Sequence, residues 1–440
     1  MGFRAGIFNK RDIKPKLPSD KRARRDDPSG TAAPKSPSHN FFTTPFMLPT
    51  INITPKGVQW FQRGSPRGGH PWIYATDIVS KTTDVPGIVT VFGPNQSFLA
   101  QALYSPASQI ALRILSRSRE TIDKKWFEGK IAASIKKRND LEIPSTAKRL
   151  VFAEADGIPS LIVDQYESYL VVQTLSAGLE KFKTEIFEIL KKLLNPKGIL
   201  ERNDVSVRRK EKLPEIKECV YGEVPKQIII TEGDLKFFVD LWTGQKTGAF
   251  LDQRENRLFA GHKAEGNVLD VFSYQGWFAC HMARKAKSVL CVESSKEACA
   301  KILENAKLNG LESKITIESE DGFDFLKNAD RAGKHFDTIN LDPPAFIKTG
   351  AEREQGFRGY KEINLRAMKL LKPRGTLITS SCSYHFSIED FEEMLDVAAQ
   401  DANVDLDLIC QTGPALDHPT LPNFPEGNYL KCYFLNVKSA

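Results

Sequence analysis

Long hydrophobic runs are missing from this chain of 440 residues. Its apolar stretches are short, such as Leu161–Val163 and Ile228–Ile230, whereas a helix that spans a bilayer needs about 20 apolar residues. The first residues are charged and lack the apolar segment of a secretory signal. We therefore expect a protein without membrane spans that stays in the cytoplasm.

Paired cysteines and metal-ligand spacings are missing as well. The seven cysteines are odd in number, no two of them form a CxxC pair, and no histidine cluster accompanies them. Such a set fits neither a disulfide framework nor a zinc site. We expect reduced thiols, one of them available for chemistry, and no bound metal.

The chain has little excess charge outside its first segment. Residues 1–47 contain ten Lys or Arg and four Asp or Glu, which leaves 52 basic and 51 acidic residues for 48–440. The Pro- and Ser-rich composition of 1–47 predicts a disordered basic tail, which either binds RNA or is simply solvated. We expect residues 1–46 to be dispensable for folding and catalysis, and Met47 is a candidate for the natural start.

The length exceeds what one hydrophobic core covers, so we expect several domains. Residues 48–118 read as strands and turns, including a strand over 57–61, and predict a small β-barrel. Residues 119–232 predict an α+β domain. Over 233–440, strand, turn and helix alternate, which predicts an α/β Rossmann-like domain with a parallel sheet. In such sheets, ligands bind at the carboxyl ends of the strands.

The loop after the first strand of this last region has too few glycines for a diphosphate. Its passage Asp270–Phe278 has only Gly276, whereas a diphosphate needs the three glycines of G-x-G-x-x-G. S-adenosylmethionine has no diphosphate, and its cationic amino group can pair with Asp270. The loop residues that we expect to contact this cofactor are Phe272, Ser273 and Gly276.

Acidic residues follow the next two predicted strands. Glu293 ends the second strand, where its carboxylate can accept hydrogen bonds from both ribose hydroxyls of the cofactor. Asp321 follows the third strand and is placed to contact the adenine amino group. The alternative is that both acids only stabilise helix N-termini, by about 0.3–1 kcal/mol each. We predict the ligand roles, because both residues lie at successive strand ends.

Four passages carry a family resemblance: Gly69–Trp72, Asp156–Asp164, Gly244–Arg254 and the cofactor loop. Through them, residues 56–437 resemble the large-subunit ribosomal RNA methyltransferases that make 5-methylcytosine and carry an N-terminal PUA domain. The resemblance implies a PUA-like barrel followed by a class I methyltransferase domain.

The resemblance also assigns residues and partners. It places Gln253 and Arg254 beside the methionine end of S-adenosylmethionine, and it implies ribosomal RNA as the partner. The chain departs from the family at Gln275 and Trp277, where Thr and Gly are usual, and at Ser160, where Gly is usual.

The fourth strand closes with Asp342, Pro343 and Pro344. The prolines hold an extended turn that presents Asp342 and the Pro343 carbonyl to a ligand. In methyltransferases of this sheet type, the pattern recognises a base edge with an amino group, which implies contacts of Asp342 with base and cofactor. Methylation of exocyclic amines uses much the same passage, and a plain structural turn is a further alternative.

Cys382 follows the fifth strand and favours carbon methylation. Cytosine C5 is a poor nucleophile, so a thiolate must first add to C6, and Cys382 can supply it. We expect neighbouring donors or positive charge to lower its pKa. A buried inert cysteine is the alternative, and His385 either assists or is a structural hydrogen-bonding group. The passage after the fourth strand has no second cysteine, so the base that removes the C5 proton is unassigned.

Basic and aromatic residues form two groups that we predict to contact RNA. The first lies in the predicted barrel and the second follows residue 200. The predicted contacts are Arg63, Arg67, His70 and Trp72 in the first group and Arg208 and Arg209 in the second. Either group is alternatively a solvated face.

The sequence leaves three functions open. The first is a methyltransferase for cytosine C5 in large-subunit ribosomal RNA. The second is an RNA methyltransferase for a guanine or adenine nitrogen, which would not need Cys382. The third is an RNA-binding protein that keeps the fold without turnover. The target nucleotide and the oligomeric state, a homodimer included, are not determined by the sequence.

Overall fold

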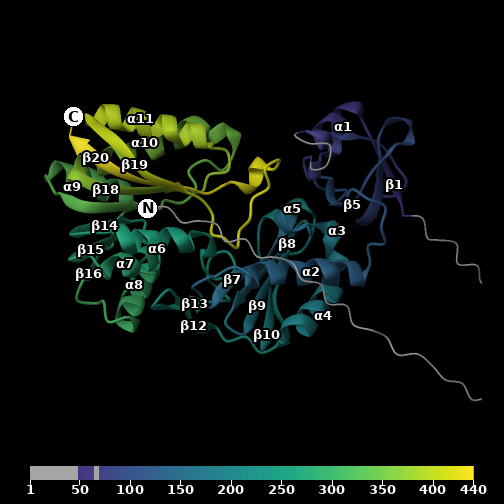
Figure 1. The fold of residues 1–440 in the computed structure, drawn as a ribbon, viewed down its shortest axis with the longest axis horizontal. Coiled ribbons are helices and arrows are strands. Elements are labelled where there is room, and N and C mark those ends of the chain that lie inside the picture. Colours follow the sequence, from purple (N-terminus) through teal and green to yellow (C-terminus); the bar gives the residue numbers. More distant parts are fainter. Residues whose placement is uncertain (1–47, 64–68, 440) are drawn as a thin grey trace, which may run out of the picture. The chain divides into compact units, whose positions relative to one another are not determined.

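The computed structural model describes residues 48–63 and 69–439, and the chain from Leu48 onward forms one compact unit. The predicted tail over 1–47 and the predicted RNA contact Arg67 lie outside the described residues. Figure 1 shows the order of the elements along the chain. Within the described ranges, no helix has the length and apolar character that crossing a membrane requires.

The N-terminal domain is built on one six-stranded sheet with the order β2-β6-β5-β4-β1-β3. Alternate residues such as Val89, Val91 and Ala100 face its core, as expected for strands with one buried side. Its elements are β1 (Thr50–Ile53), α1 (Pro55–Gln62), β2 (Trp72–Ile73), β3 (Ile78–Lys81), β4 (Gly87–Phe92), β5 (Phe98–Tyr104) and β6 (Leu112–Ser116).

The strand predicted over 57–61 is wrong, because these residues belong to helix α1. Thr54 caps this helix, its hydroxyl accepting a hydrogen bond from the Gly57 amide at 2.9 Å. Pro55 occupies the first helical position, where its missing amide proton costs nothing. The start signals of a helix therefore outweigh the apolar spacing that suggested a strand.

The central domain is a five-stranded sheet, β11-β10-β9-β8-β7, with helices packed on it. Phe127 of its long helix α2 and Ile186 of helix α4 belong to the core over this sheet. Its elements are α2 (Lys124–Asn139), β7 (Ala147–Phe152), β8 (Leu161–Tyr166), β9 (Tyr169–Thr174), α3 (Ala177–Glu180), α4 (Lys183–Leu194), β10 (Gly198–Arg202), α5 (Val207–Lys210) and β11 (Lys217–Gly222).

A hairpin of β12 (Gln227–Glu232) and β13 (Leu235–Asp240) follows. Its second strand packs on the next domain, since the Phe238 amide donates to Asn305 of helix α8 (Lys296–Leu308) and the Lys236 amide donates to Asn309, which caps the end of that helix. The expected domain boundary between residues 232 and 233 therefore falls in the turn of this hairpin.

The C-terminal domain has a seven-stranded sheet with the order β16-β15-β14-β17-β18-β20-β19. The strands pair in parallel except β20, which is antiparallel to both of its neighbours. The strand order reverses between β14 and β17, which is where such sheets bind ligands. The strands are β14 (Asn267–Val271), β15 (Ser288–Val292), β16 (Ile315–Glu318), β17 (Phe336–Leu341), β18 (Leu371–Ser381), β19 (Val404–Thr412) and β20 (Lys431–Ser439).

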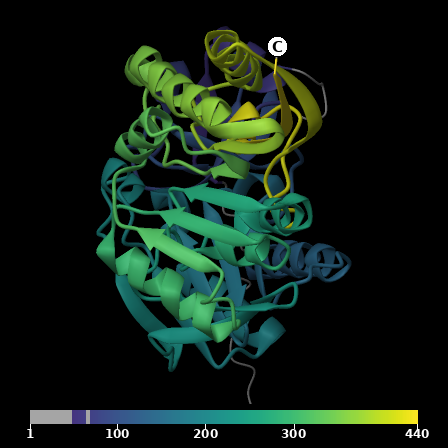
Figure 2. The same cartoon turned by 90° about the vertical axis from the view of Figure 1, so that its left-hand side faces the viewer.

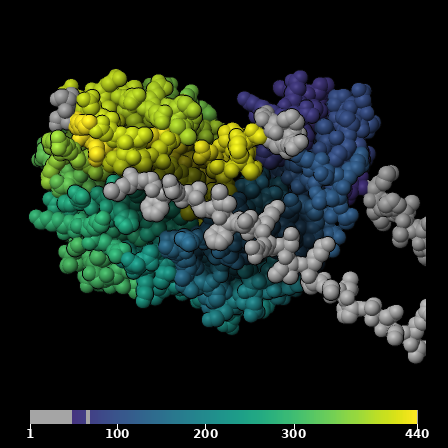
Figure 3. Space-filling view, viewed as in Figure 1, coloured from purple at the N-terminus to yellow at the C-terminus, as the bar shows by residue number. Residues whose placement is uncertain are grey.

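Helices cover both faces of this sheet (Figures 1 and 2). Alternate strand residues point to opposite faces, so Val268 packs in one core with α6, α7 and α8, and Leu269 in another with α9, α10 and α11. In the space-filling view, yellow-green residues of α11 form part of the surface of this domain (Figure 3). The helices not yet located are α6 (Arg254–Lys263), α7 (Trp277–Ala283), α9 (Gly322–Arg331), α10 (Arg353–Leu370) and α11 (Ile388–Ala402).

Candidate active site

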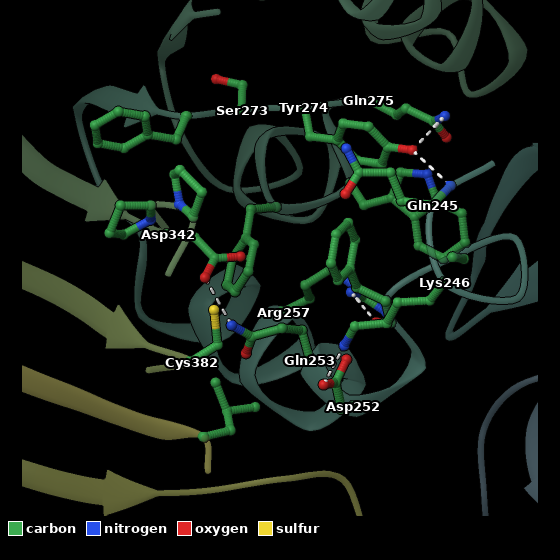
Figure 4. Close-up of a pocket in the computed structure, with 18 of the residues that line it drawn as sticks. Gln245, Lys246, Asp252, Gln253, Arg257, Ser273, Tyr274, Gln275, Asp342 and Cys382 are labelled. Carbon is green, nitrogen blue, oxygen red and sulfur yellow. Dashed lines mark hydrogen bonds and ion pairs between the residues drawn. The ribbon is translucent and has the colours of Figure 1, made fainter. Parts of the chain in front are cut away.

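A cavity of about 510 Å³ opens at the carboxyl ends of β14, β15, β17 and β18 (Figure 4). Asp270, Glu293, Asp342 and Cys382 all line it, although they are far apart in sequence. Each stands at the end of its strand or just beyond, and the four strands are neighbours in the sheet. The fold therefore gathers the acidic and thiol groups that the sequence placed at successive strand ends.

The loop between β14 and α7 takes its shape from left-handed backbone. Phe272, Tyr274 and Gly276 have φ angles of 65°, 50° and 76°. A Cβ on Gly276 would lie 2.9 Å from the Ile302 side chain, so glycine is required where helix α7 begins. Phe272 and Ser273 line the cavity, whereas Gly276 is not among its lining residues, and its contact with the cofactor stays a prediction.

Glu293 holds the loop and lines the cavity. Its carboxylate accepts hydrogen bonds at 2.8 Å from the backbone amides of Tyr274 and Ser295. Ser295 caps helix α8. Glu293 thus supports the turn and the helix start while it lines the cavity, and its contact with the ribose stays a prediction.

Asp270 is buried and only half satisfied. Its Oδ1 accepts a hydrogen bond from Asn340 Nδ2 at 2.7 Å, while Oδ2 has no partner among the described residues. Burial raises the pKa of Asp270 to about 7, and the negative charges of Asp342 and Glu293 add to the shift. An unpaired carboxylate oxygen in a cavity wall fits a cationic ligand such as the amino group of S-adenosylmethionine.

Asp342 is oriented by a neighbouring amide. Gln253 Nε2 donates to Asp342 Oδ1 at 2.8 Å, and Gln253 Oε1 accepts from Asn256 at 2.6 Å, which fixes the direction of the Gln253 amide (Figure 4). Burial raises the pKa of Asp342 to about 6, with the charge of Asp252 as a further cause. Asp342 is therefore still mostly ionised at pH 7, with about one molecule in ten protonated.

The thiol of Cys382 lies near Asp342 at the cavity wall (Figure 4). Burial raises its pKa to about 11, and the negative charge of Asp342 acts in the same direction. The expectation of a lowered pKa for Cys382 is therefore wrong. Burial of the thiol and the negative charges of Asp342 and Asp252 outweigh the positive charge of Lys246. His385 is exposed and packs against Tyr384, away from the cavity residues.

Lys246, Asp252 and Tyr429 form a cluster at the cavity that the sequence analysis did not identify. Lys246 Nζ lies 2.5 Å from Asp252 Oδ2, and the Tyr429 hydroxyl donates to the same oxygen at 2.6 Å. Lys246 has a left-handed φ of 54°, which is uncommon for a residue with a side chain. Lys246 and Asp252 lie in the passage Gly244–Arg254, which could have indicated them from the sequence. Tyr429 is brought beside them only by the fold.

Arg254 does not take its predicted place at the cofactor. Its fully buried guanidinium donates to both carboxylate oxygens of Asp417, at 2.9 and 3.0 Å, and also to Glu255. Arg257, one turn further along α6, lines the cavity instead. The two arginines are only about 60° apart around the helix, but their side chains end on different partners, Arg254 on Asp417 and Arg257 on Glu232.

Asp321 has the capping role that was its alternative. It is exposed, and its Oδ1 accepts hydrogen bonds from the amides of Phe323 and Asp324 at the start of α9. It lies outside the residues that line the cavity. Its contact with adenine stays a prediction that the geometry of the cavity does not support.

Three predicted RNA contacts are buried or engaged within the protein. His70 is 3% exposed, with Nε2 at 3.1 Å from Glu426 Oε2. Trp72 is half-buried and donates from Nε1 to Glu154 at 2.8 Å. Arg208 is fully buried and pairs with Glu180. Each of these side chains has a partner within the protein, and their contacts with RNA stay predictions.

Arg63 and Arg209 are exposed. Arg63 lies over the ring of Trp60, and Arg209 pairs at the surface with Glu215. Both are accessible to a phosphate backbone. In the described part of the chain, no group of three or more His, Cys, Asp or Glu side chains could hold a metal ion.

The strand order with an antiparallel β20, the single-glycine loop and the half-paired Asp270 together define a class I methyltransferase domain. Models of two families match the chain in agreement with this. Residues 51–117 match a PUA-like domain, and residues 203–417 match an S-adenosylmethionine-dependent methyltransferase. The expected fold class and cofactor are confirmed.

Curated relatives cover most of the chain. A protein of Pseudoalteromonas atlantica named ribosomal RNA large subunit methyltransferase I is 37% identical over 82% of this chain and 94% of its own length. A Vibrio cholerae protein of the same name is 38% identical over 84% and 96%. The chain belongs to the ribosomal RNA large subunit methyltransferase I family.

Solved structures share the fold. A protein from Streptococcus mutans, described as an S-adenosylmethionine-dependent methyltransferase, has a TM-score of 0.75 and 21% identity, and it covers 88% of this chain and 100% of its own. A second structure with a TM-score of 0.75 and 20% identity, covering the same shares, was solved as a complex with S-adenosylhomocysteine.

Proposed function

We propose that the protein transfers a methyl group from S-adenosylmethionine to C5 of a cytosine in large-subunit ribosomal RNA. The observation that carries this proposal is the thiol of Cys382 in the same cavity wall as Asp270, Glu293 and Asp342. The names of the relatives support ribosomal RNA as the substrate. We expect the protein to work in the cytoplasm.

In this proposal, different residues of the cavity bind different parts of the cofactor. Asp270 Oδ2 pairs with the amino group, and Glu293 accepts from the ribose hydroxyls. Gln253 donates to Asp342, and Asp342 and Cys382 face the base in this proposal (Figure 4). When bound, S-adenosylmethionine supplies an electrophilic methyl group.

Cys382 acts as the nucleophile. Its thiolate adds to C6 of cytosine, and the electron pair of the C5–C6 double bond makes C5 nucleophilic. C5 takes the methyl group, and S-adenosylhomocysteine leaves. Loss of the C5 proton to a base and release of the Cys382 thiolate then restore the ring. No residue is assigned as this base.

Asp342 links base recognition to thiol activation. In its protonated form it donates to cytosine N3 and carries no charge, which removes one of the two main causes of the raised pKa of Cys382. Binding of the base therefore favours the thiolate at the moment when it is needed.

A mechanism-based trap tests the proposal. RNA with 5-fluorocytosine at the target position cannot lose its C5 substituent as a proton, so the wild-type protein should remain bound covalently after methyl transfer. Cys382→Ala should form no adduct, and Cys382→Ser should retain the cofactor; both should lose turnover by at least about a thousandfold.

The same experiment distinguishes the proposed reaction from its nearest alternative. That alternative is methylation of a guanine or adenine nitrogen, which needs no thiolate and would be consistent with the raised pKa of Cys382 and the Asp342-Pro343-Pro344 turn at the cavity. Full activity of Cys382→Ala would establish that route. Mapping methylated nucleotides in ribosomal RNA with and without the protein identifies the modified atom and excludes a binding protein without turnover.

We also propose that the PUA-like domain docks the RNA by its shape and its 2′-hydroxyls. The exposed Arg63 and Arg209 would contact phosphates, replacing the buried side chains that the sequence suggested. Such contacts give binding without base specificity, so the target cytosine is selected in the cavity.

A further inference from the structure

Lys431 is a buried cation directly behind the loop that carries Cys382. It lies on β20 opposite Ser381 of β18 and is 2% exposed. Its Nζ donates to the backbone carbonyl of Ser383 at 2.9 Å and to that of Phe386 at 2.5 Å. One ammonium group therefore ties together both ends of the turn that follows Cys382.

This ammonium lacks an anionic partner at short range. Among the described residues, Lys431 forms no ion pair with a carboxylate, and the charges that act on it are those of Cys382 first and Asp390 second. Burial lowers the pKa of Lys431 to about 8. A buried ammonium with only carbonyl partners is costly, so an anion nearby would stabilise it.

The other charges around Cys382 are mixed in sign. Asp342 at the end of β17 and Asp252 disfavour a thiolate, while Lys246 favours one. Lys246 is already paired with Asp252, to which Tyr429 also donates. Of these groups, Lys431 alone brings a positive charge that no carboxylate neutralises within the described structure.

We propose that Lys431 is a positioning residue for Cys382, which fixes the turn after the cysteine and favours the thiolate through its own positive charge. The inference rests on the nucleophilic role of Cys382 proposed above. It assigns a chemical function to β20, a strand that contributes no residue of its own to the cavity wall.

Three variants separate the charge from the hydrogen bonds. Lys431→Arg retains the positive charge, Lys431→Gln retains N–H donors without charge, and Lys431→Met removes both. Lys438→Met serves as the control, since Lys438 is on the same strand but half exposed and paired with Asp407. Thermal unfolding and binding of S-adenosylmethionine show that each full-length variant is folded.

The readout is the alkylation rate of Cys382 by iodoacetamide, measured by mass spectrometry of its peptide. No RNA is needed, so the result does not depend on turnover. The exposed Cys219 in the same digest is an internal reference thiol. Rates are compared from pH 7 to 10, because Lys431 is mostly charged at pH 7 and loses its proton above pH 8.

At pH 7 we expect Lys431→Gln and Lys431→Met to slow the alkylation of Cys382 by about tenfold, corresponding to a thiol pKa about one unit higher. Lys431→Arg and Lys438→Met should stay within about twofold of the wild type, and Cys219 should be unaffected. The difference in alkylation rate between the wild type and the two slow variants should become smaller above pH 8, because Lys431 then loses its charge.

Two results would overturn the inference. An unchanged rate in Lys431→Met would show that the ammonium does not influence the thiol. A normal rate in Lys431→Gln with a slow rate in Lys431→Met would show that only the hydrogen bonds matter. A different pair of results would count against the proposed nucleophile. The wild type would form no adduct with 5-fluorocytosine RNA, while the Lys431 variants would still alkylate Cys382 more slowly than the wild type.

Discussion

Two sets of buried charges in this protein are treated in opposite ways. One set joins the central domain to the C-terminal domain, and its members are paired. The other lines the cavity, where Asp270 has an unpaired oxygen and Asp342 and Cys382 have raised pKa values. The comparison separates buried groups that are paired within the protein from buried groups that line the cavity without full pairing.

The paired set centres on Asp417. Its carboxylate accepts from both terminal nitrogens of Arg254 and from the backbone amide of Arg149, and His418 Nδ1 lies 2.9 Å away. Arg149 in turn makes a bidentate pair with Asp164 at 2.8 Å. These donors, above all His418 and Arg254, hold the pKa of Asp417 far below its usual range despite burial. Such groups are satisfied before any ligand arrives.

Removing Asp417 should give the largest change in stability. Asp417→Ala leaves the fully buried Arg254 without its bidentate partner, which typically costs about 3–5 kcal/mol. Urea unfolding at pH 7 measures the effect. Glu255→Ala is the matched control, because it removes the more exposed partner of the same arginine. An equal loss in both variants would contradict the central place of Asp417.

Asp342→Asn should separate turnover from thiol reactivity. The amide can still donate a hydrogen bond to cytosine N3 but cannot transfer a proton to it, which should lower methyl transfer by about a hundredfold. Removal of the negative charge should at the same time lower the pKa of Cys382 and speed its alkylation. Slower alkylation in this variant would show that Asp342 does not act on the thiol through its charge.

Asp270→Asn should make the free protein more stable and the cofactor complex weaker. The pKa of Asp270 is raised in the fold, so its unfavourable contribution is absent below pH 4 and develops as pH rises toward about 7. We expect a gain of about 1–3 kcal/mol at pH 8 that shrinks as the pH falls below 6. Thermal unfolding across this range measures it, and calorimetry should show weaker binding of S-adenosylmethionine. A variant less stable than the wild type at pH 8 would contradict the strain assigned to this carboxylate.

Arg209→Ala should give the smallest effect. We expect unchanged folding, a loss of RNA affinity of less than about 1 kcal/mol, and a salt dependence of binding that falls by about one charge. Arg209→Lys should keep the salt dependence of the wild type. A large fall in melting temperature would mean that Arg209, like its buried neighbour Arg208, belongs to the fold.

The sequence predicted the strand ends of the site because their signals are local. Asp270, Glu293, Asp342 and Cys382 each follow a short apolar strand, and the parallel arrangement brings such ends together. The contacts of Arg254 could not be predicted, because Asp417 lies 163 residues further along the chain. The pairing of His70 could not be predicted for the same reason, since Glu426 is 356 residues away.

Helices α10 and α11 were not predicted, although α11 begins with a capping box at Ser387 and Asp390. In this region the sequence was interpreted for the apolar strand and for the motif around Cys382, and the helical signals on either side were overlooked. Helix α1 was missed because its signal is a cap and a proline rather than a periodic apolar pattern.

The place of β20 between β18 and β19 has a consequence for synthesis. The strand is made after both of its neighbours, yet it must enter between them, so β18 and β19 cannot close the sheet early. Until residues 431–439 have emerged from the ribosome, the turn after Cys382 lacks its anchor. If Lys431 favours the thiolate as proposed above, the thiol of Cys382 gains that charge only after β20 has been synthesised.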